Sequence, residues 1–409
     1  MPNLYAGRFP AVVNDEQLLP FPLLKTGQRL SAVSDVSDVE TEVELEVERV
    51  VPTKSLLSRD LVLDHVFVSN VRFLAMIAIV WVHAELMWGY YAGSAAYLQV
   101  VLLQLMKFGT IDFFLISGFL LGEGLTRSSP LQYFRRRVKA VFQPWVFWGC
   151  VWFGIALSES LIKVGGHALA GSSLRVIVVQ YFRFVFTESI YWFVPNFFVC
   201  LAIVLALHRR VSDVVQGLLF LAFSLFYAVN AYIAVIPPFH TAALFGFVFY
   251  LWLGAFAYTH RARWSRWLDG VPWWKLILYT TVAATTAVLE FHVLQTRNSL
   301  DPHNTLRLSN QVFSVLVALL IVKCKRTLYP SYIKVRMETF GIFLIHPILM
   351  ALVDIGVKPI SKGTKSLFYS NGPISLCLEV VSFCVLYFGA LIATKVLRTV
   401  PLLAWTVGG

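Results

Sequence analysis

Apolar residues along this chain gather in long blocks that are separated by short, mostly basic connections. From Arg72 onward each block has roughly the ~20 residues that a helix needs to cross a bilayer. The ten blocks with this pattern are residues 72–90, 100–122, 140–162, 190–207, 213–235, 241–259, 273–293, 306–322, 338–356 and 374–395. They predict an all-α, polytopic membrane protein with about ten transmembrane helices.

One further stretch departs from this pattern. Residues 163–189 are amphipathic, and Arg175 and Arg183 interrupt the sequence SLRVIVVQYFRFVF. Such a segment is typical of a helix that lies at the membrane interface.

The pattern also changes before the first block. Residues 1–64 hold 11 Asp and Glu against 6 Lys and Arg, and no basic stretch followed by an apolar core opens the chain, so we expect no signal peptide. Residues 38–50 alternate acidic and aliphatic positions, which fits a half-buried strand or a docking segment. A solvated, flexible acidic tail is the favoured interpretation. We therefore expect a cytoplasmic tail over 1–64 and a transmembrane domain over 65–409.

Composition supports this class. The 409 residues are 58% hydrophobic and 14% charged, and the mean hydropathy is +0.70, outside the usual range of soluble proteins. Aromatic residues make up 15% of the chain, as expected for belts at two membrane interfaces. After residue 70 no polar stretch is long enough to hold a soluble catalytic domain.

The basic residues predict the orientation of the spans. The connections 123–139, 208–212, 260–272 and 323–337, with the end after residue 394, hold 17 Lys and Arg, whereas the alternate connections hold 8. Positive charge favours the cytoplasmic side, so we expect both termini in the cytoplasm and the protein in the plasma membrane. The same bias explains the net charge of +11 without a nucleic-acid partner.

Several kinds of site have no signal in the sequence. There is no Walker loop, no GxSxG elbow and no metal-ligand spacing, so we expect no metal. The five cysteines form no CxxC pair and are interpreted as small buried apolar residues: Cys150, Cys200, Cys324, Cys377 and Cys384.

The first span carries ionisable residues that lipid does not favour. Arg72 and His83 are eleven residues apart, so in a helix they share a face and lie about 16 Å apart along the axis. Arg72 could simply extend to the headgroups. A histidine inside a span usually faces a cavity or a partner, and with Glu85 nearby we predict a polar pocket in which His83 handles a proton.

The second span is denser still, since Lys107, Asp112 and Ser117 lie within KFGTIDFFLISGFLLGEG. Its glycines Gly109 and Gly118 permit close approach of another helix. A Lys107–Asp112 ion pair used for packing is the alternative to a site.

Two other spans add candidates. A basic cluster stands at the start of the third span, before Pro144, a residue that we expect to kink the helix: Arg135, Arg136, Arg137 and Lys139. It is either a topology signal or, beside Arg72, a site for nucleotide phosphates. The ninth span places His346 directly before Pro347, which could open a second polar spot.

In combination these residues resemble the acyltransferase 3 family of membrane O-acyltransferases. That family has an arginine, ten residues and a histidine in its first span, as Arg72 and His83 stand here. FGTIDFFLISGF, FRRRVKAVFQP, YWFV with Trp192, and FGIFLIHP are similar to its later motifs. Lys139 stands where arginine is commoner and Phe343 where tyrosine is usual. The resemblance covers about 70–400.

The resemblance implies transfer of an acyl group, commonly acetyl, from cytosolic acyl-coenzyme A to a hydroxyl of a carbohydrate or another envelope-associated or lipid-linked acceptor. Arg72, Arg135, Arg136, Arg137 and Lys139 would then hold the donor, and His83 would act as general base or carry the acyl group itself. Glu85, Lys107, Asp112, Ser117, Trp192 and His346 would support the substrates or the site.

Two other classes of function stay open on the sequence. A secondary transporter or flippase for a polar or lipid-linked solute would suit the ionisable groups inside the spans, although no paired halves are visible. A membrane scaffold acting through its acidic tail is the third interpretation.

Overall fold

The computed structural model describes residues 54–88, 94–164, 172–370 and 372–408. Backbone contacts divide the chain into a unit that ends at Leu61 and a unit that begins at Val62. The alternating segment 38–50 lies outside the described residues, and the predicted domain boundary near residue 64 stays a prediction. The second unit contains the apolar helices and every candidate site residue.

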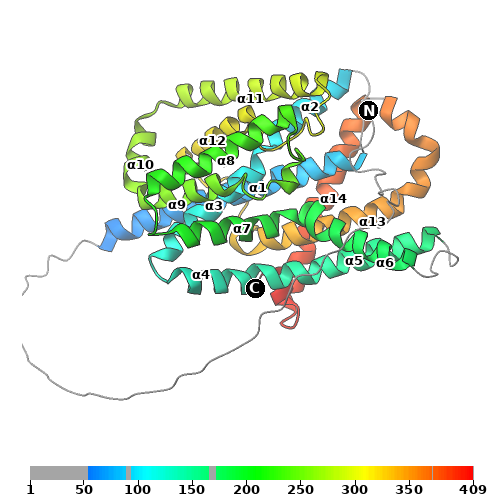
Figure 1. Ribbon diagram of the computed structural model, residues 1–409, viewed down its shortest axis with the longest axis horizontal. Coiled ribbons are helices and arrows are strands. Elements are labelled where there is room, and N and C mark those ends of the chain that lie inside the picture. Colours follow the sequence, from blue (N-terminus) through cyan, green and yellow to red (C-terminus); the bar gives the residue numbers. More distant parts are fainter. Residues whose placement is uncertain (1–53, 89–93, 165–171, 371, 409) are drawn as a thin grey trace, which may run out of the picture. The chain divides into compact units, whose positions relative to one another are not determined.

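All regular structure in the described part of the chain is helical, so the all-α prediction is confirmed (Figure 1). The helices, in chain order, are α1 (Lys54–Trp88), α2 (Ser94–Met106), α3 (Phe108–Leu125), α4 (Pro130–Arg137), α5 (Gln143–Val164), α6 (Ser172–Arg183), α7 (Phe193–Leu207), α8 (Asp213–Ile233), α9 (Val248–Thr259), α10 (Arg261–Gly270), α11 (Trp273–Thr296), α12 (Leu308–Lys323), α13 (Val335–Ser370) and α14 (Gly372–Thr399). Short 3₁₀ and π turns join some of them.

Eight segments in the described residues are long and apolar enough to cross a membrane. They are Val66–Glu85, Tyr97–Leu125, Pro130–Glu159, Ile190–Leu207, Asp213–Ile233, Trp273–Thr296, Val335–Gly356 and Pro373–Thr399. The other two predicted spans, 241–259 and 306–322, form the shorter apolar helices α9 and α12. At 1.5 Å per residue these measure about 18 and 24 Å, less than the ~30 Å hydrocarbon core.

Irregular backbone precedes each short helix, over 234–247 before α9 and 297–307 before α12. Side-chain amides satisfy part of this backbone: Asn196 Nδ2 donates to the Ala243 carbonyl at 3.0 Å, and Asn230 both donates to and accepts from Ile236 at 3.0 Å. Non-helical backbone at membrane depth is tolerated where it is buried in protein or lines a cavity. These two segments, which we call the site loops, are therefore where a polar site can form.

Helices α3 and α9 pack against each other through two glycines. A Cβ on Gly118 would stand 1.9 Å from the Leu251 carbonyl oxygen, and a Cβ on Gly254 would stand 2.0 Å from that of Leu115. The backbones touch because neither residue has a side chain. The close approach expected at Gly118 is confirmed, and it fixes α9, with the site loop before it, against α3.

Contacts between distant segments define the two ends of this unit. At one end Asn70 Nδ2 donates to the Arg326 carbonyl at 2.8 Å, and Lys325 pairs with Asp269 at 2.7 Å. We call this the basic end. At the other, the loop end, the site loops lie near the junction of α2 and α3, where Gln104 contacts the loop residue His303 at 3.1 Å.

Two local predictions have clear outcomes. The helix irregularity expected at Pro144 is present as a π turn, Val138–Phe142, directly before α5. The cysteine prediction holds for Cys200, which is buried, but is wrong for Cys150 and Cys377, which are exposed. Both sit on outward helix faces, and lipid accepts an apolar side chain as readily as a protein core does.

Candidate active site

Two histidines from distant spans meet in the core. His83 Nδ1 of α1 lies 3.1 Å from His346 Nε2 of α13, and the rings stack with centroids 5.3 Å apart. His346 is fully buried, and its Nδ1 lies 3.0 Å from the Ile342 carbonyl oxygen. His346 therefore contacts His83 on the Nδ1 side of its ring.

The chemistry of these contacts fixes the tautomers of the neutral pair. A carbonyl oxygen only accepts, so His346 Nδ1 carries a proton and its Nε2 accepts. His83 must then donate from Nδ1, which leaves the lone pair of His83 Nε2 free. This is the arrangement that a general base or a nucleophile needs.

A cavity of about 50 Å³ lies beside His83. Its polar lining comes from five separate segments: His83, Lys107, Thr110, Trp192, His240 and Thr305. Phe193, Phe343 and aliphatic side chains close the rest. A space of this size holds one or two water molecules, not a sugar ring, so only a small reacting group of a substrate would fit.

Lys107 stands at the one-residue break between α2 and α3, and only 7% of it is exposed. Both carboxylate oxygens of Asp112 lack a hydrogen-bond partner within the described residues, so the alternative of a Lys107–Asp112 ion pair is wrong. The two residues are only five positions apart, but Lys107 lines the cavity and Asp112 does not. A buried ammonium beside a cavity is well suited to a negative charge that develops there during a reaction.

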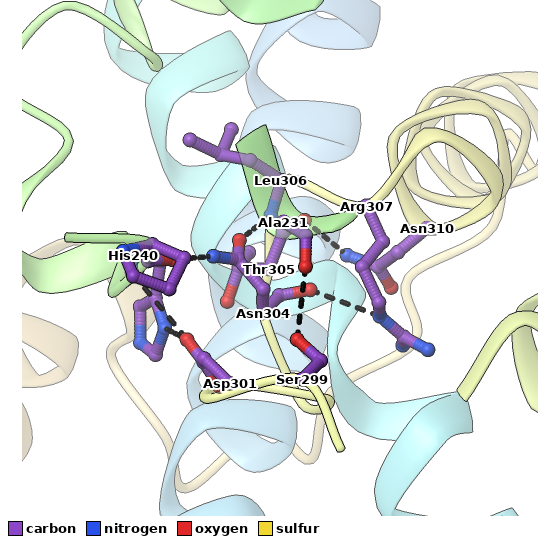
Figure 2. Close-up of polar contacts among 10 residues, drawn as sticks. Ala231, His240, Ser299, Asp301, Asn304, Thr305, Leu306, Arg307 and Asn310 are labelled. Atoms are coloured by element: carbon purple, nitrogen blue, oxygen red, sulfur yellow. Dashed lines mark hydrogen bonds and ion pairs between the residues drawn. The ribbon is translucent and has the colours of Figure 1, made fainter. Parts of the chain in front are cut away.

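His240 lies on the first site loop and points at Asp301 of the second (Figure 2). Its Nδ1 lies 3.0 Å from Asp301 Oδ2, and its ring meets Trp192 edge to face at 5.5 Å. Burial alone would raise the pKa of Asp301, but the hydrogen bond from His240 and the nearby positive charge of Lys107 lower it overall. Asp301 is therefore an ionised partner that orients His240.

The second site loop is held by polar contacts. Buried Arg307 donates from Nε to the Asn304 carbonyl at 3.0 Å, as Figure 2 shows. It also donates from Nη1 to the Ala287 carbonyl at 3.0 Å and from Nη2 to Gln104 Oε1. Ser299 Oγ donates to the Ala231 carbonyl at 2.9 Å. The loop is thus rigid where it presents Asp301 and Thr305.

His303, on the same loop, accepts at Nδ1 a hydrogen bond from Gln104 Nε2 at 3.1 Å. Burial, with the nearby charge of Lys107, lowers the pKa of His303 to about 3. His303 is neutral at physiological pH and acts as part of the loop's packing.

A second group of charges lies at the basic end. Arg72 is partly exposed, and the cations near enough to act on it are Arg137 and Arg336, with Tyr133 beside them. Arg137 Nε donates to Tyr133 Oη at 3.0 Å, and its guanidinium stacks 5.1 Å from the ring centroid. We call Arg72, Arg137 and Arg336 the arginine cluster; three guanidinium groups close to one another suit a phosphate.

The remaining predicted donor residues do not join this cluster. Arg135, Arg136 and Lys139 are exposed, and Arg136 Nη2 donates to Ser128 Oγ at 2.5 Å. On a short helix successive side chains point in different directions, so one arginine of three faces Arg72.

Three other predicted site residues lie away from the cavity lining. Glu85 is buried on α1 and is near enough for its charge to act on Lys107. Asp112 is fully buried in α3, and Ser117 is half-buried in the same helix. By contrast His83, Lys107 and Trp192 line one cavity, and His346 contacts His83; their roles stay predictions.

Sequence reasoning missed His240, Asp301 and Thr305, and the place of Arg336 near Arg72. His240 and Asp301 are 61 residues apart in irregular segments, and no motif links them. The available signal was the polar character of the stretches before the sixth and eighth spans, FH and LDPHNT, which should have marked broken helices.

Comparison with known proteins gives one match. A family described as an acyltransferase domain, acyltransferase 3, matches residues 65–398. No curated protein and no solved structure matches the chain.

Proposed function

The chain belongs to the acyltransferase 3 family and is an integral membrane acyltransferase, and from this premise we propose that it transfers an acetyl group from acyl-coenzyme A to a hydroxyl. The acceptor class we propose is a carbohydrate or another envelope-associated or lipid-linked molecule. The single observation that carries the proposal is the pairing of His83 with His346 beside a small polar cavity.

The donor side is the basic end, which we place in the cytoplasm of the plasma membrane. The arginine cluster would hold the phosphates of coenzyme A, because guanidinium forks match phosphate oxygens. Arg72 and His83 are eleven residues apart on α1, or about 16 Å at 1.5 Å per residue. The extended pantetheine arm would span that distance and bring the thioester to the cavity.

The cavity supplies what attack on a thioester requires. His83 Nε2 has a free lone pair, and the hydrogen bond from His83 Nδ1 to His346 holds the ring in place. Lys107 lines the same cavity, so its ammonium group would stabilise the oxyanion of the tetrahedral intermediate. No cluster of His, Cys, Asp or Glu that could hold a metal occurs in the described residues.

The test is donor binding and thiol release by the purified protein. Wild type should bind acetyl-coenzyme A and release free coenzyme A, whereas His83→Gln should bind the donor with similar affinity but release thiol about 10²–10⁴-fold more slowly. A protein that neither binds nor cleaves acetyl-coenzyme A would refute the donor assignment. Undiminished cleavage by His83→Gln would refute the role of His83.

A further inference from the structure

The cavity is lined by two histidines, each of which has its Nδ1 atom in a hydrogen bond with a second residue. His83 has Nδ1 engaged by His346, and His240 has Nδ1 engaged by Asp301 at 3.0 Å. Because a carboxylate only accepts, His240 donates from Nδ1 and its Nε2 is the free nitrogen. His83 and His240 are the two histidines among the residues that line the cavity. His240 is close enough to act on His83 electrostatically.

The two rings reach the cavity from different directions. His83 is on α1, on the helix that leads from the arginine cluster, while His240 is on the site loop before α9 at the loop end. Trp192 and Thr305 line the same cavity: Trp192 meets the His240 ring edge to face, and the Thr305 hydroxyl can hydrogen-bond the reacting hydroxyl group of an acceptor. This arrangement favours a donor that arrives at His83 and an acceptor that arrives at His240.

The size of the cavity favours a reaction in two steps, one at each histidine. About 50 Å³ accommodates an acetyl group or a hydroxyl, but leaves little room for a thioester sulfur and an attacking sugar oxygen on one carbon at once. Separate steps at separate histidines remove this conflict.

We propose that His240, oriented by Asp301, is the base that activates the acceptor hydroxyl, and that His83 carries the acyl group between donor and acceptor. This rests on the proposed function, whose two mechanisms, general base or acyl carrier at His83, it resolves. His83 and His240 are both catalytic residues, and Asp301 is a positioning residue.

The chemistry balances in two steps. His83 Nε2 attacks the thioester carbon, the C–S bond breaks, coenzyme A leaves as thiolate, and the Nδ1 proton moves along the hydrogen bond to His346. His240 Nε2 then takes the acceptor's hydroxyl proton, the oxygen attacks the acyl carbon, and the C–N bond breaks with return of the electron pair to Nε2 and of the proton to His83 Nδ1. The proton on His240 is released to solvent and completes the thiol of coenzyme A.

The experiment uses acetyl-coenzyme A with water or hydroxylamine as the acyl acceptor. Hydroxylamine is small enough for the cavity and needs no base to attack an acyl-imidazole, whereas water does. Rapid-quench thiol release and intact mass of the full chain are measured for wild type, His83→Gln, His240→Gln and Asp301→Asn. His260→Gln, a partly buried histidine at the C-terminus of α9, is the matched control.

We expect His240→Gln to keep a burst of one thiol per protein with an acetyl group on the chain, to lose turnover with water about 10²-fold, and to recover it with hydroxylamine. Asp301→Asn should show the same difference between water and hydroxylamine, but a smaller one. His83→Gln should lose both the burst and the turnover. His260→Gln should match wild type.

Three results would overturn the proposal. They are wild-type cleavage without a burst or acetylated chain, normal turnover of His240→Gln with water, and loss of both reactions in a His240→Gln protein that still binds donor and elutes as a folded monodisperse species. If wild type does not bind or cleave acetyl-coenzyme A at all, the proposed function fails, and the assignment of His240 fails with it.

Discussion

At the scale of single residues, the donor site that we propose depends on which guanidinium groups lie near Arg72. Arg137→Ala and Arg336→Ala should each weaken acetyl-coenzyme A binding about 10- to 100-fold, since a charged hydrogen bond contributes on the order of 1.5–3 kcal/mol. Arg135→Ala should change it by less than about twofold, because Arg135 is an exposed residue outside the cluster. Isothermal titration of the purified variants measures both.

Arg72→Lys separates geometry from charge at the same site. Lysine keeps the positive charge but lacks the planar fork, so a large loss of affinity would indicate bidentate recognition of phosphate. If Arg135→Ala weakened binding as much as Arg137→Ala, the arginine cluster would attract the donor only through its general positive charge and not through specific contacts with phosphate.

At the same scale, His346 acts only through His83. His346→Ala removes the acceptor for His83 Nδ1, and we expect kcat to fall about 10²-fold or more with little change in donor affinity. His346→Gln offers a carbonyl oxygen to the same proton and should recover part of the rate. Equal activity in wild type and His346→Ala would show that the stacked pair is packing alone.

At the scale of helices, the α3–α9 contact leaves no room for a side chain. Gly118→Ala and Gly254→Ala place a carbon about 2 Å from backbone oxygens, so the helices must separate. We expect each to lower the melting temperature and the yield of folded protein, as overpacking costs about 1–3 kcal/mol or more. Fluorescence-detected size exclusion with heating measures both.

Gly154→Ala is the control for this contact, because nothing lies within 4 Å of its Cβ position in α5. It should leave stability unchanged or raise it slightly, as alanine favours a helix over glycine. Tolerance of Gly118→Ala equal to that of Gly154→Ala would contradict the close packing.

The site loop 297–307 should respond to acid. The pKa of His303 is about 3 against an ordinary 6.5; the folded state therefore binds this proton less readily than the unfolded state, and stability that is complete above pH 6.5 declines as the pH falls towards 3. The lowered pKa of Asp301 adds to the loss below its ordinary 3.8. Melting temperatures should drop from neutral pH to about pH 4, and less steeply in His303→Gln. Parallel curves for the two proteins would exclude His303 as the sensor.

The elements also show where the sequence was sufficient. Long apolar runs with basic ends predicted ten spans, because burial in lipid leaves a strong pattern over twenty residues. Eight of them are long enough to cross a membrane in the described residues, and the other two are the shorter helices α9 and α12. Arg72, His83 and His346 stood out as ionisable groups inside such runs. His240 and Asp301 did not, since polar residues between spans look like ordinary connections until α9 and α12 prove too short to cross.

At the scale of the whole molecule, the proposed topology places the loop end outside the cell. Leu300→Cys, at a residue 55% exposed on the second site loop, should react with an impermeant maleimide added to intact cells that carry a protein without its five native cysteines. Ser331→Cys, exposed at the basic end, should react only after permeabilisation. The reverse pattern would invert both donor and acceptor sides.

An acyltransferase that takes its donor from one face of the membrane and its acceptor from the other is a potential ion leak. The cavity of about 50 Å³ limits that leak, because Phe193, Phe343 and aliphatic side chains leave room for only one or two water molecules. On the proposed route the acyl group passes this constriction bonded to His83, so no open channel is needed while the substrate is exchanged. We expect that replacing Phe343 by a small residue would widen the cavity, let protons pass and dissipate the membrane potential that the cell maintains.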